Sequence, residues 1–328
     1  MTLPKFEYFA PKTLSRAIAL QKEDGKFLAG GTDLLVAMKK KIQRPGRMID
    51  LNGIAALKSV RRAQTNQIRI GALNTLSQLQ DNALVRQYFP ALSAVIADVG
   101  AWQLRNLGTL GGNLCLDTRC YYYNQSVFLK KRFVPCLKAG GDVCHVVKGK
   151  DTCYAVYSGD MAATLVSLGA GVKIAGPGYD NEMALAGLFS GSGIKPNILK
   201  FNEILTHVTL PIPPAGSGFS YRKLRLRDTI DFPLLGVAVF LRLEPGSGVC
   251  RDLRLVLGAI APAPIVVAEA AEMVRNRKIT PALMEEVGQI AREKAHPVAN
   301  TAATPRYRRR MVPELVKEAI REALSRTI

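Results

Sequence analysis

The sequence has few of the side chains that carry acid–base and nucleophilic catalysis. It contains three histidines, His145, His207 and His296, and none of them forms a nucleophile motif with a serine or a cysteine. No two carboxylates have a spacing that indicates acid–base work. We therefore expect no catalytic residue in this chain and a structural role for each histidine.

Acidic residues are also scarce. The chain has 26 Asp and Glu against 45 Lys and Arg, a formal net charge of +19. The basic runs, at 39–41, 130–132 and 308–310, are not interleaved with aromatics, and no helix-turn-helix or zinc-finger spacing is present. We expect no nucleic-acid partner. Solvated faces with subunit contacts, or an acidic redox partner, remain as interpretations of the charge.

No uncharged apolar run approaches the ~20 residues that a spanning helix needs, and the N-terminal residues contain no apolar signal region. We therefore expect a cytoplasmic protein without a membrane partner. Six cysteines in a reducing compartment are not expected to form a disulfide framework, which leaves metal ligation, redox chemistry or simple burial.

Two glycine-rich segments stand out; we call residues 28–35 and 105–113 the first and second glycine segments. In the first, a short strand is expected at 26–29 and a helix at 34–41, with Thr32 or Asp33 as its N-cap. This arrangement directs backbone N–H groups at one point and suits a phosphate. The second is predicted as a double-glycine loop. Together they could bind the two phosphates of a dinucleotide, whereas no G-x-G-x-x-G supports a Rossmann site.

A cysteine-rich stretch follows. Cys120, Cys136, Cys144 and Cys153 are 16, 8 and 9 positions apart, and Cys115 lies five before Cys120. The absence of C-x-x-C argues against a zinc ribbon, and the spacing differs from the two common ferredoxin patterns. A four-thiolate metal site and incidental thiols therefore both remain open. The stretch has little periodic apolar sequence, so it needs something to order it, which a metal can supply.

The remaining pattern predicts an α+β protein. Asp160 is expected to cap a helix over 161–168, and the linker at 211–218 is the best candidate for a domain boundary. Beyond it, strands precede helices. Strands are expected at Phe219–Leu226, Leu234–Leu243 and Leu253–Ile260, and helices at Pro264–Arg275, Pro281–Lys294 and Pro313–Arg326.

Several motifs resemble those of the FAD-binding subunits of the xanthine dehydrogenase and carbon monoxide dehydrogenase family. They are Ala29-Gly-Gly-Thr-Asp33, Thr109-Leu-Gly-Gly-Asn113, Ser158-Gly-Asp160, Tyr221-Arg-Lys223 and Tyr307-Arg-Arg-Arg310. The resemblance implies a PCMH-type (vanillyl-alcohol-oxidase-like) FAD-binding domain of two subdomains plus a C-terminal α+β domain of the CO dehydrogenase flavoprotein type. The implied limits are 1–215, divided into 1–55 and 56–215, and 216–328.

The resemblance also implies the residues that contact FAD. They are Leu28, Ala29, Gly30, Gly31, Thr32, Asp33, Leu34, Leu35, Thr109, Leu110, Gly111, Gly112 and Asn113, with Asp160 and Lys223 at further flavin-contacting positions. A surface charge is the alternative for Lys223.

Most family members have a short link where this chain carries an insertion at about 116–156. The insertion resembles that of the flavin subunits of 4-hydroxybenzoyl-CoA reductases, on the residues from Asn113 to Cys120, Pro135 to Lys138, Gly141 to Val146 and Cys153-Tyr154. The resemblance implies a [4Fe–4S] cluster on Cys120, Cys136, Cys144 and Cys153. Cys115 and Cys250 are not expected to be ligands.

The implied function is electron transfer within a molybdenum enzyme. Reduced ferredoxin would supply electrons through [4Fe–4S] and FAD to a small subunit with two [2Fe–2S] clusters. A large molybdopterin subunit would then remove the phenolic hydroxyl of 4-hydroxybenzoyl-CoA, giving benzoyl-CoA, in a dimer of heterotrimers. One alternative is an oxidative molybdenum hydroxylase acting on xanthine, an aldehyde or an N-heterocycle. A second is a zinc-stapled binding protein with a flavin fold.

Overall fold

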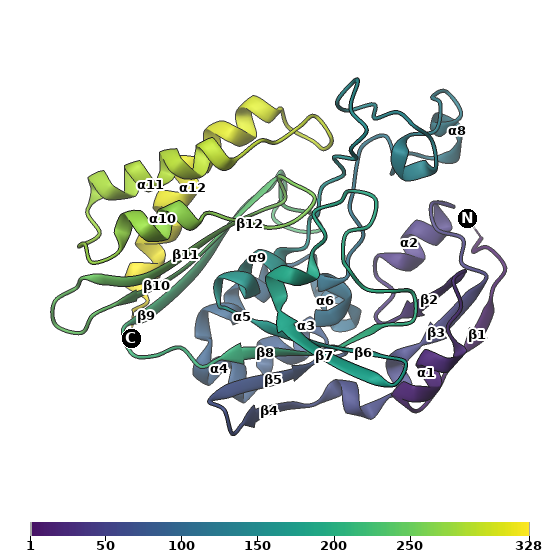
Figure 1. Cartoon of the computed structure of the whole chain (residues 1–328), viewed down its shortest axis with the longest axis horizontal. Coiled ribbons are helices and arrows are strands. Elements are labelled where there is room, and N and C mark those ends of the chain that lie inside the picture. Colours follow the sequence, from purple (N-terminus) through teal and green to yellow (C-terminus); the bar gives the residue numbers. More distant parts are fainter. Residues whose placement is uncertain (1, 328) are drawn as a thin grey trace.

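A computed structural model describes residues 2–327, in which three β-sheets are each accompanied by helices (Figure 1). The first sheet is parallel, in the order β1-β3-β2, and the first glycine segment leaves its edge strand. Its elements are β1 (Glu7–Phe9), α1 (Leu14–Leu20), β2 (Gly25–Leu28), α2 (Leu34–Lys39) and β3 (Arg47–Asp50), followed by 3₁₀ turns at Leu51–Gly53 and Ala55–Lys58.

The second sheet is antiparallel, in the order β4-β5-β8-β6-β7, and short helices pack against it. Its strands are β4 (Val60–Ala63), β5 (Gln67–Gly71), β6 (Gly171–Gly176), β7 (Tyr179–Ala184) and β8 (Ile204–Pro211). The helices are α3 (Leu76–Asp81), α4 (Ala83–Tyr88), α5 (Pro90–Ala97), α6 (Trp102–Leu107), α7 (Leu110–Leu114) and α9 (Asp160–Ser167), with a 3₁₀ turn at Leu185–Leu188. All eight residues of α9 are buried, so this helix anchors the middle of the molecule.

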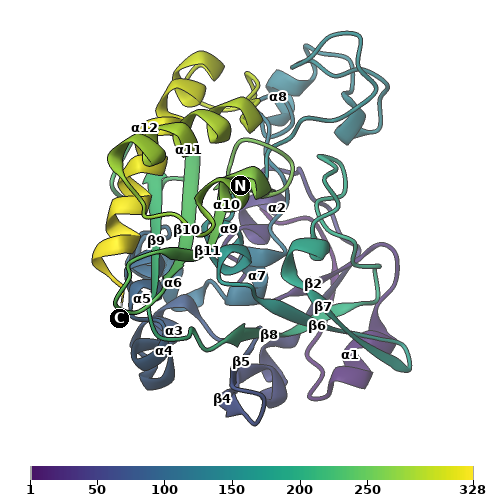
Figure 2. The same ribbon diagram turned by 60° about the vertical axis from the view of Figure 1, so that its left-hand side comes forward.

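The third sheet, β12-β11-β10-β9, is covered on one face by three helices (Figure 2). Successive side chains of β10 alternate between two cores: Val237 and Val239 face the helices, whereas Ala238 and Phe240 join the core around α9. The elements are β9 (Ser217–Leu224), β10 (Leu235–Leu243), β11 (Cys250–Gly258), β12 (Ile265–Val266), α10 (Ala268–Val274), α11 (Pro281–Lys294) and α12 (Pro305–Ser325). The predicted α+β fold, with strands before helices, is confirmed.

Several predicted elements were wrong in detail. The last helix begins at Pro305, capped by the Thr304 hydroxyl, and contains Pro313 in its interior rather than starting there. The stretch predicted as a helix from Pro264 holds the short strand β12 before α10 begins. The predicted double-glycine loop contains the helix α7, because Thr109 accepts a hydrogen bond from Gly112 N–H and caps it.

The insertion stands away from the sheets in both views (Figures 1 and 2). It contains only α8 (Val127–Lys130) and a 3₁₀ turn at Leu137–Ala139. Among the described residues, no helix combines the length and the apolar character that crossing a membrane requires.

Candidate functional site

The structure brings the two glycine segments together. A Cβ atom on Gly30 would lie 1.8 Å from the carbonyl oxygen of Leu107, so no side chain fits at position 30. Close by, a Cβ atom built on Gly108 would lie 3.6 Å from the Thr32 hydroxyl oxygen. The two segments therefore form one continuous wall, which we call the glycine wall.

The first glycine segment offers backbone donors. Within residues 2–327, the N–H groups of Gly31, Thr32 and Asp33 have no hydrogen-bond acceptor. Gly31 adopts φ +71°, a left-handed conformation that turns successive N–H groups toward the same side. Such a concave set of donors suits an anionic group such as a phosphate.

In the second glycine segment, most backbone N–H groups already donate to other groups of the protein. Leu110 N–H donates to Asn74, and Gly111 N–H donates to Ala72 at 2.8 Å. A Cβ on Gly111 would lie 2.7 Å from the Cβ of Ala72, so this glycine permits packing on the sheet. Among the described residues, the Thr109 N–H and the Asn113 side-chain amide are donors of this segment that remain for a ligand.

Asn113 connects the glycine wall to α9. Its side-chain oxygen accepts a hydrogen bond from Met161 N–H at 3.2 Å, and its carbonyl oxygen accepts one from the Tyr157 hydroxyl at 2.7 Å. The predicted role of Asp160 as the N-cap of this helix was wrong. Gly159 holds that position, and Asp160 is the first helical residue.

Asp160 instead belongs to a buried ion pair. Its carboxylate accepts hydrogen bonds from the Tyr221 hydroxyl at 2.9 Å and from Lys223 Nζ at 3.2 Å. The side chains of Asp160 and Lys223 are 4% and 1% exposed, which excludes a surface charge at Lys223. Burial raises the pKa of Asp160, although Lys223 and Tyr221 oppose this shift. The pair fixes β9 to the start of α9, next to Met161, whose N–H bonds to Asn113.

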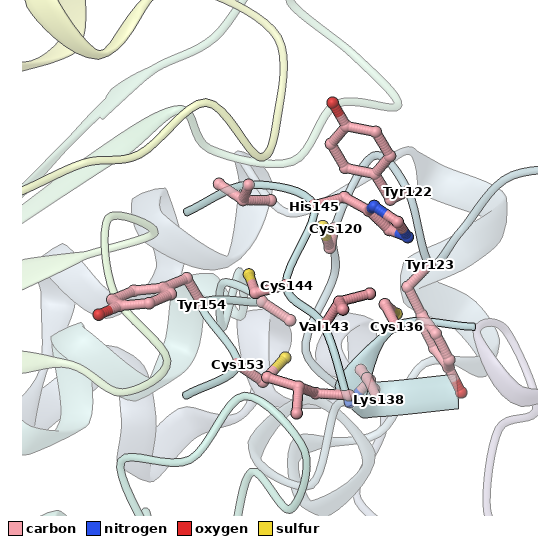
Figure 3. A pocket seen from close by; sticks show the side chains of 13 residues that line it. Cys120, Tyr122, Tyr123, Cys136, Lys138, Val143, Cys144, His145, Cys153 and Tyr154 are labelled. Carbon is pink, nitrogen blue, oxygen red and sulfur yellow. The ribbon is translucent and has the colours of Figure 1, made fainter. Parts of the chain in front are cut away.

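All four cysteines predicted as ligands line one cavity inside the insertion (Figure 3). Cys120 and Cys153 are buried, whereas Cys136 and Cys144 are partly exposed, and all four are free thiols. Burial raises the pKa of the Cys120 and Cys153 thiols, and backbone N–H groups that bond to the sulfurs partly offset this effect. The other two cysteines, Cys115 and Cys250, do not line the cavity.

The donor set fits a metal centre in kind, because four thiolates are the usual ligands of iron–sulfur clusters and of many zinc sites. The described residues contain no group of three or more His, Cys, Asp or Glu placed to hold one metal ion. Figure 3 shows the four cysteine side chains on different sides of the cavity. A single zinc ion needs all four ligands at ~2.3 Å from one atom, whereas a four-iron cluster takes its thiolates around a larger body.

Lys138 also lines this cavity and attaches the insertion to the rest of the chain. Its ammonium group donates to Asp117 Oδ1 at 2.8 Å, to Thr118 Oγ1 at 2.7 Å and to the Gly193 carbonyl at 2.7 Å. The side chain is 3% exposed. The sequence did not identify this role, because a lysine near cysteines has no distinguishing pattern.

Arg119 connects the two candidate sites. It immediately precedes Cys120, and its guanidinium pairs with the carboxylate of Asp33 in the first glycine segment. It also lies 4.1 Å from the centroid of the Phe232 ring. Asp33 occupies the N-cap position of α2, but its side chain makes no capping bond because Arg119 holds it. The ion pair joins residues far apart in the sequence, so no local pattern could have predicted it.

Two family models match the chain. The FAD binding domain in molybdopterin dehydrogenase matches residues 4–213, and the CO dehydrogenase flavoprotein C-terminal domain matches residues 219–323. These matches indicate a flavin-binding domain followed by a second domain.

Characterised proteins show the same similarity. The chain is 35% identical to the aldehyde oxidoreductase FAD-binding subunit of Escherichia coli over 76% of this chain and 79% of that protein. It is 27% identical to the nicotinate dehydrogenase FAD-subunit of Eubacterium barkeri over 95% and 94%. The carbon monoxide dehydrogenase structure from Hydrogenophaga pseudoflava superimposes with a TM-score of 0.82 and 25% identity, covering 100% of both chains.

Proposed function

The chain belongs to the family of FAD-binding subunits of molybdenum hydroxylases, and from this premise we propose that it is an electron-transfer subunit whose partners carry out the substrate chemistry. The observation that carries the proposal is the glycine wall. In this wall, the free N–H groups of Gly31, Thr32 and Asp33 lie in the segment that contacts the second glycine segment. Free backbone donors at this place suit the phosphates of a dinucleotide.

FAD is the cofactor that fits this wall. The N–H groups of Gly31, Thr32 and Asp33 would bind its pyrophosphate, and the Asn113 amide would approach it from the other segment. When bound, FAD accepts and releases one or two electrons, which suits an exchange between one-electron and two-electron carriers. The close approach of the Leu107 carbonyl to Gly30 leaves no room for a side chain between the two segments.

We propose that the partners are a large molybdopterin subunit and a small subunit with two [2Fe–2S] clusters, assembled as a dimer of heterotrimers. The relatives support a division of labour of this kind, since they are named as FAD subunits or medium chains of larger enzymes. Their names also favour the oxidative direction, because they act as dehydrogenases or oxidoreductases of nicotinate, aldehydes and carbon monoxide.

The four-cysteine cavity favours a second candidate, a reductase of the 4-hydroxybenzoyl-CoA type that takes electrons from ferredoxin. Cys120, Cys136, Cys144 and Cys153 would hold a [4Fe–4S] cluster, which would supply a one-electron centre close to the flavin. A single zinc ion on the same four cysteines is the third alternative.

Metal and flavin analysis tests these proposals. The full chain, purified anaerobically with its partners, is expected to contain one FAD and about four irons, as [4Fe–4S] stoichiometry requires. Electron paramagnetic resonance after reduction would identify the cluster. One zinc without iron would support the zinc alternative, and absent flavin would refute the electron-transfer role.

Activity assays decide the direction. Oxidation of an aldehyde or N-heterocycle with an artificial acceptor supports the hydroxylase. Reduction of 4-hydroxybenzoyl-CoA by a low-potential donor supports the reductase, and failure of that reduction with an iron-loaded enzyme would contradict it.

A further inference from the structure

The loop between α11 and α12, in the C-terminal part of the chain, reaches across to the insertion (Figure 1). Asn300 lies in this loop and is 2% exposed. Its carbonyl oxygen accepts a hydrogen bond from Tyr121 N–H at 2.7 Å, and its side-chain amide donates to the carbonyl of Tyr154. Asn300 therefore binds two segments of the insertion, one near its beginning at Tyr121 and one near its end at Tyr154.

The two tyrosines have a specific place in the sequence. Tyr121 directly follows Cys120, and Tyr154 directly follows Cys153. These two cysteines are the buried pair among the four that line the cavity. The Tyr121 N–H belongs to the peptide group that follows Cys120, so its hydrogen bond restricts the ψ angle of Cys120. The Tyr154 carbonyl belongs to the peptide group between Tyr154 and Ala155, so its hydrogen bond holds the backbone one residue beyond Cys153. Anchoring the chain beside both cysteines on Asn300 therefore limits how far the backbones of Cys120 and Cys153 can move apart.

Asn300 is itself rigidly mounted. Arg308, fully buried on α12, donates to the carbonyl of Val298 at 3.2 Å and to those of Leu234 and Ala259 at 2.9 and 2.6 Å. No carboxylate pairs with Arg308 within the part of the chain that the structure describes. Arg308 donates hydrogen bonds to carbonyls of three separate segments. It therefore attaches the loop to the core of the C-terminal domain.

We propose that Asn300 is a positioning residue for the four-cysteine site. It lies outside the insertion and holds the chain at Cys120 in place relative to the chain at Cys153. This inference rests on the proposed metal centre and adds a requirement to it. The insertion assembles a competent ligand set only when the C-terminal domain is docked against it.

The test uses the full chain coexpressed with its partners under anaerobic conditions. Asn300→Ala removes the amide that binds the Tyr154 carbonyl, and Asn300→Asp retains its size but, as a carboxylate, cannot donate to that carbonyl. Thr301→Ala is the matched control, because among residues 2–327 the Thr301 hydroxyl bonds only to the neighbouring Ala302 carbonyl. Bound metal, FAD content and the resonance spectrum of the reduced centre are measured for each variant, together with the rate at which a chelator extracts the metal.

Both Asn300 variants are expected to release metal about 10- to 100-fold faster than the wild type, the range typical for residues that orient metal ligands. Their spectra should broaden or shift, while FAD content and the Thr301→Ala protein stay unchanged. If Asn300→Ala also lowers FAD content, the isosteric Asn300→Asp decides. Wild-type metal retention and spectrum in folded Asn300→Asp would overturn the role of Asn300 alone. A wild-type chain with FAD but no metal would overturn the proposed centre as well.

Discussion

The glycine wall and the four-cysteine insertion adjoin each other in the sequence, yet different forces hold them. Leu110 and Gly111 of the wall are buried, and Leu110 belongs to the largest core cluster of the described residues, against the second sheet and α9. The buried cluster of the insertion is small: Cys120, Cys153 and Ala155 are buried, and the side chains packed against them, Tyr122, Tyr123, Leu137 and Val146, are only partly buried. The wall is thus shaped by packing before any ligand arrives, whereas the insertion has too little apolar burial to order itself and depends on what its cysteines bind.

Replacing one cysteine should have the largest effect, because it should remove the metal from the insertion and leave the flavin on the wall. Cys136→Ser is expected to abolish the iron content, because a serine hydroxyl is a poor substitute for a thiolate, while FAD remains bound to the independently packed wall. Iron and flavin analysis of the purified complex would check this result. Cys115→Ser is the control, since burial raises the pKa of that thiol to about 12 and it lies off the cavity. Full iron retention in Cys136→Ser would refute the ligand assignment.

Loss of the buried ion pair between Lys223 and Asp160, beside the glycine wall, should lower the stability of the protein. Lys223→Met leaves the Asp160 carboxylate buried without its cation and should lower the free energy of unfolding by about 3–5 kcal/mol. Denaturant unfolding would measure this change. Lys294→Met is the matched control, because Lys294 and its partner Glu269 are 45% and 46% exposed, and its loss should cost less than about 1 kcal/mol. Equal effects of the two substitutions would show that burial of the pair is unimportant.

Two glycines offer a reciprocal test with smaller effects. A Cβ on Gly30 would meet the Leu107 carbonyl oxygen at 1.8 Å, and a Cβ on Gly141 would meet the Pro135 carbonyl oxygen, next to Cys136, at 1.9 Å. Each Ala substitution should cost about 1–3 kcal/mol through overpacking. Gly30→Ala should lower flavin occupancy and spare the metal, and Gly141→Ala should do the reverse. If both variants lost both cofactors, the two regions would not be independent.

The same contrast explains what the sequence could predict. The glycine wall depends on local turns and alternating strands, so its segments and the α+β class were predicted, and the class was confirmed. Long-range contacts were not readable: Arg119 with Asp33, and Asn300 with Tyr154, join distant positions and carry no local pattern. The start of α12 was missed although Thr304-Pro305 is a cap signal, because Pro313 offered a competing one.

The surface of the insertion should yield the smallest effect. Between Asp117 and Asp142 the sequence has no acidic residue. The basic run 130–132 lies at the end of α8 and just after it, with Arg132 over the exposed ring of Phe128 and Lys130 over the ring of Tyr123. Replacing the three basic residues with serine should leave iron and flavin content unchanged and alter stability by less than about 0.5 kcal/mol. If an acidic ferredoxin docks here, its association rate at low salt should fall several-fold, and this difference should vanish at high ionic strength because exposed charges are screened. Stopped-flow reduction at several salt concentrations would measure it, and a salt-independent difference would argue against electrostatic steering by this surface.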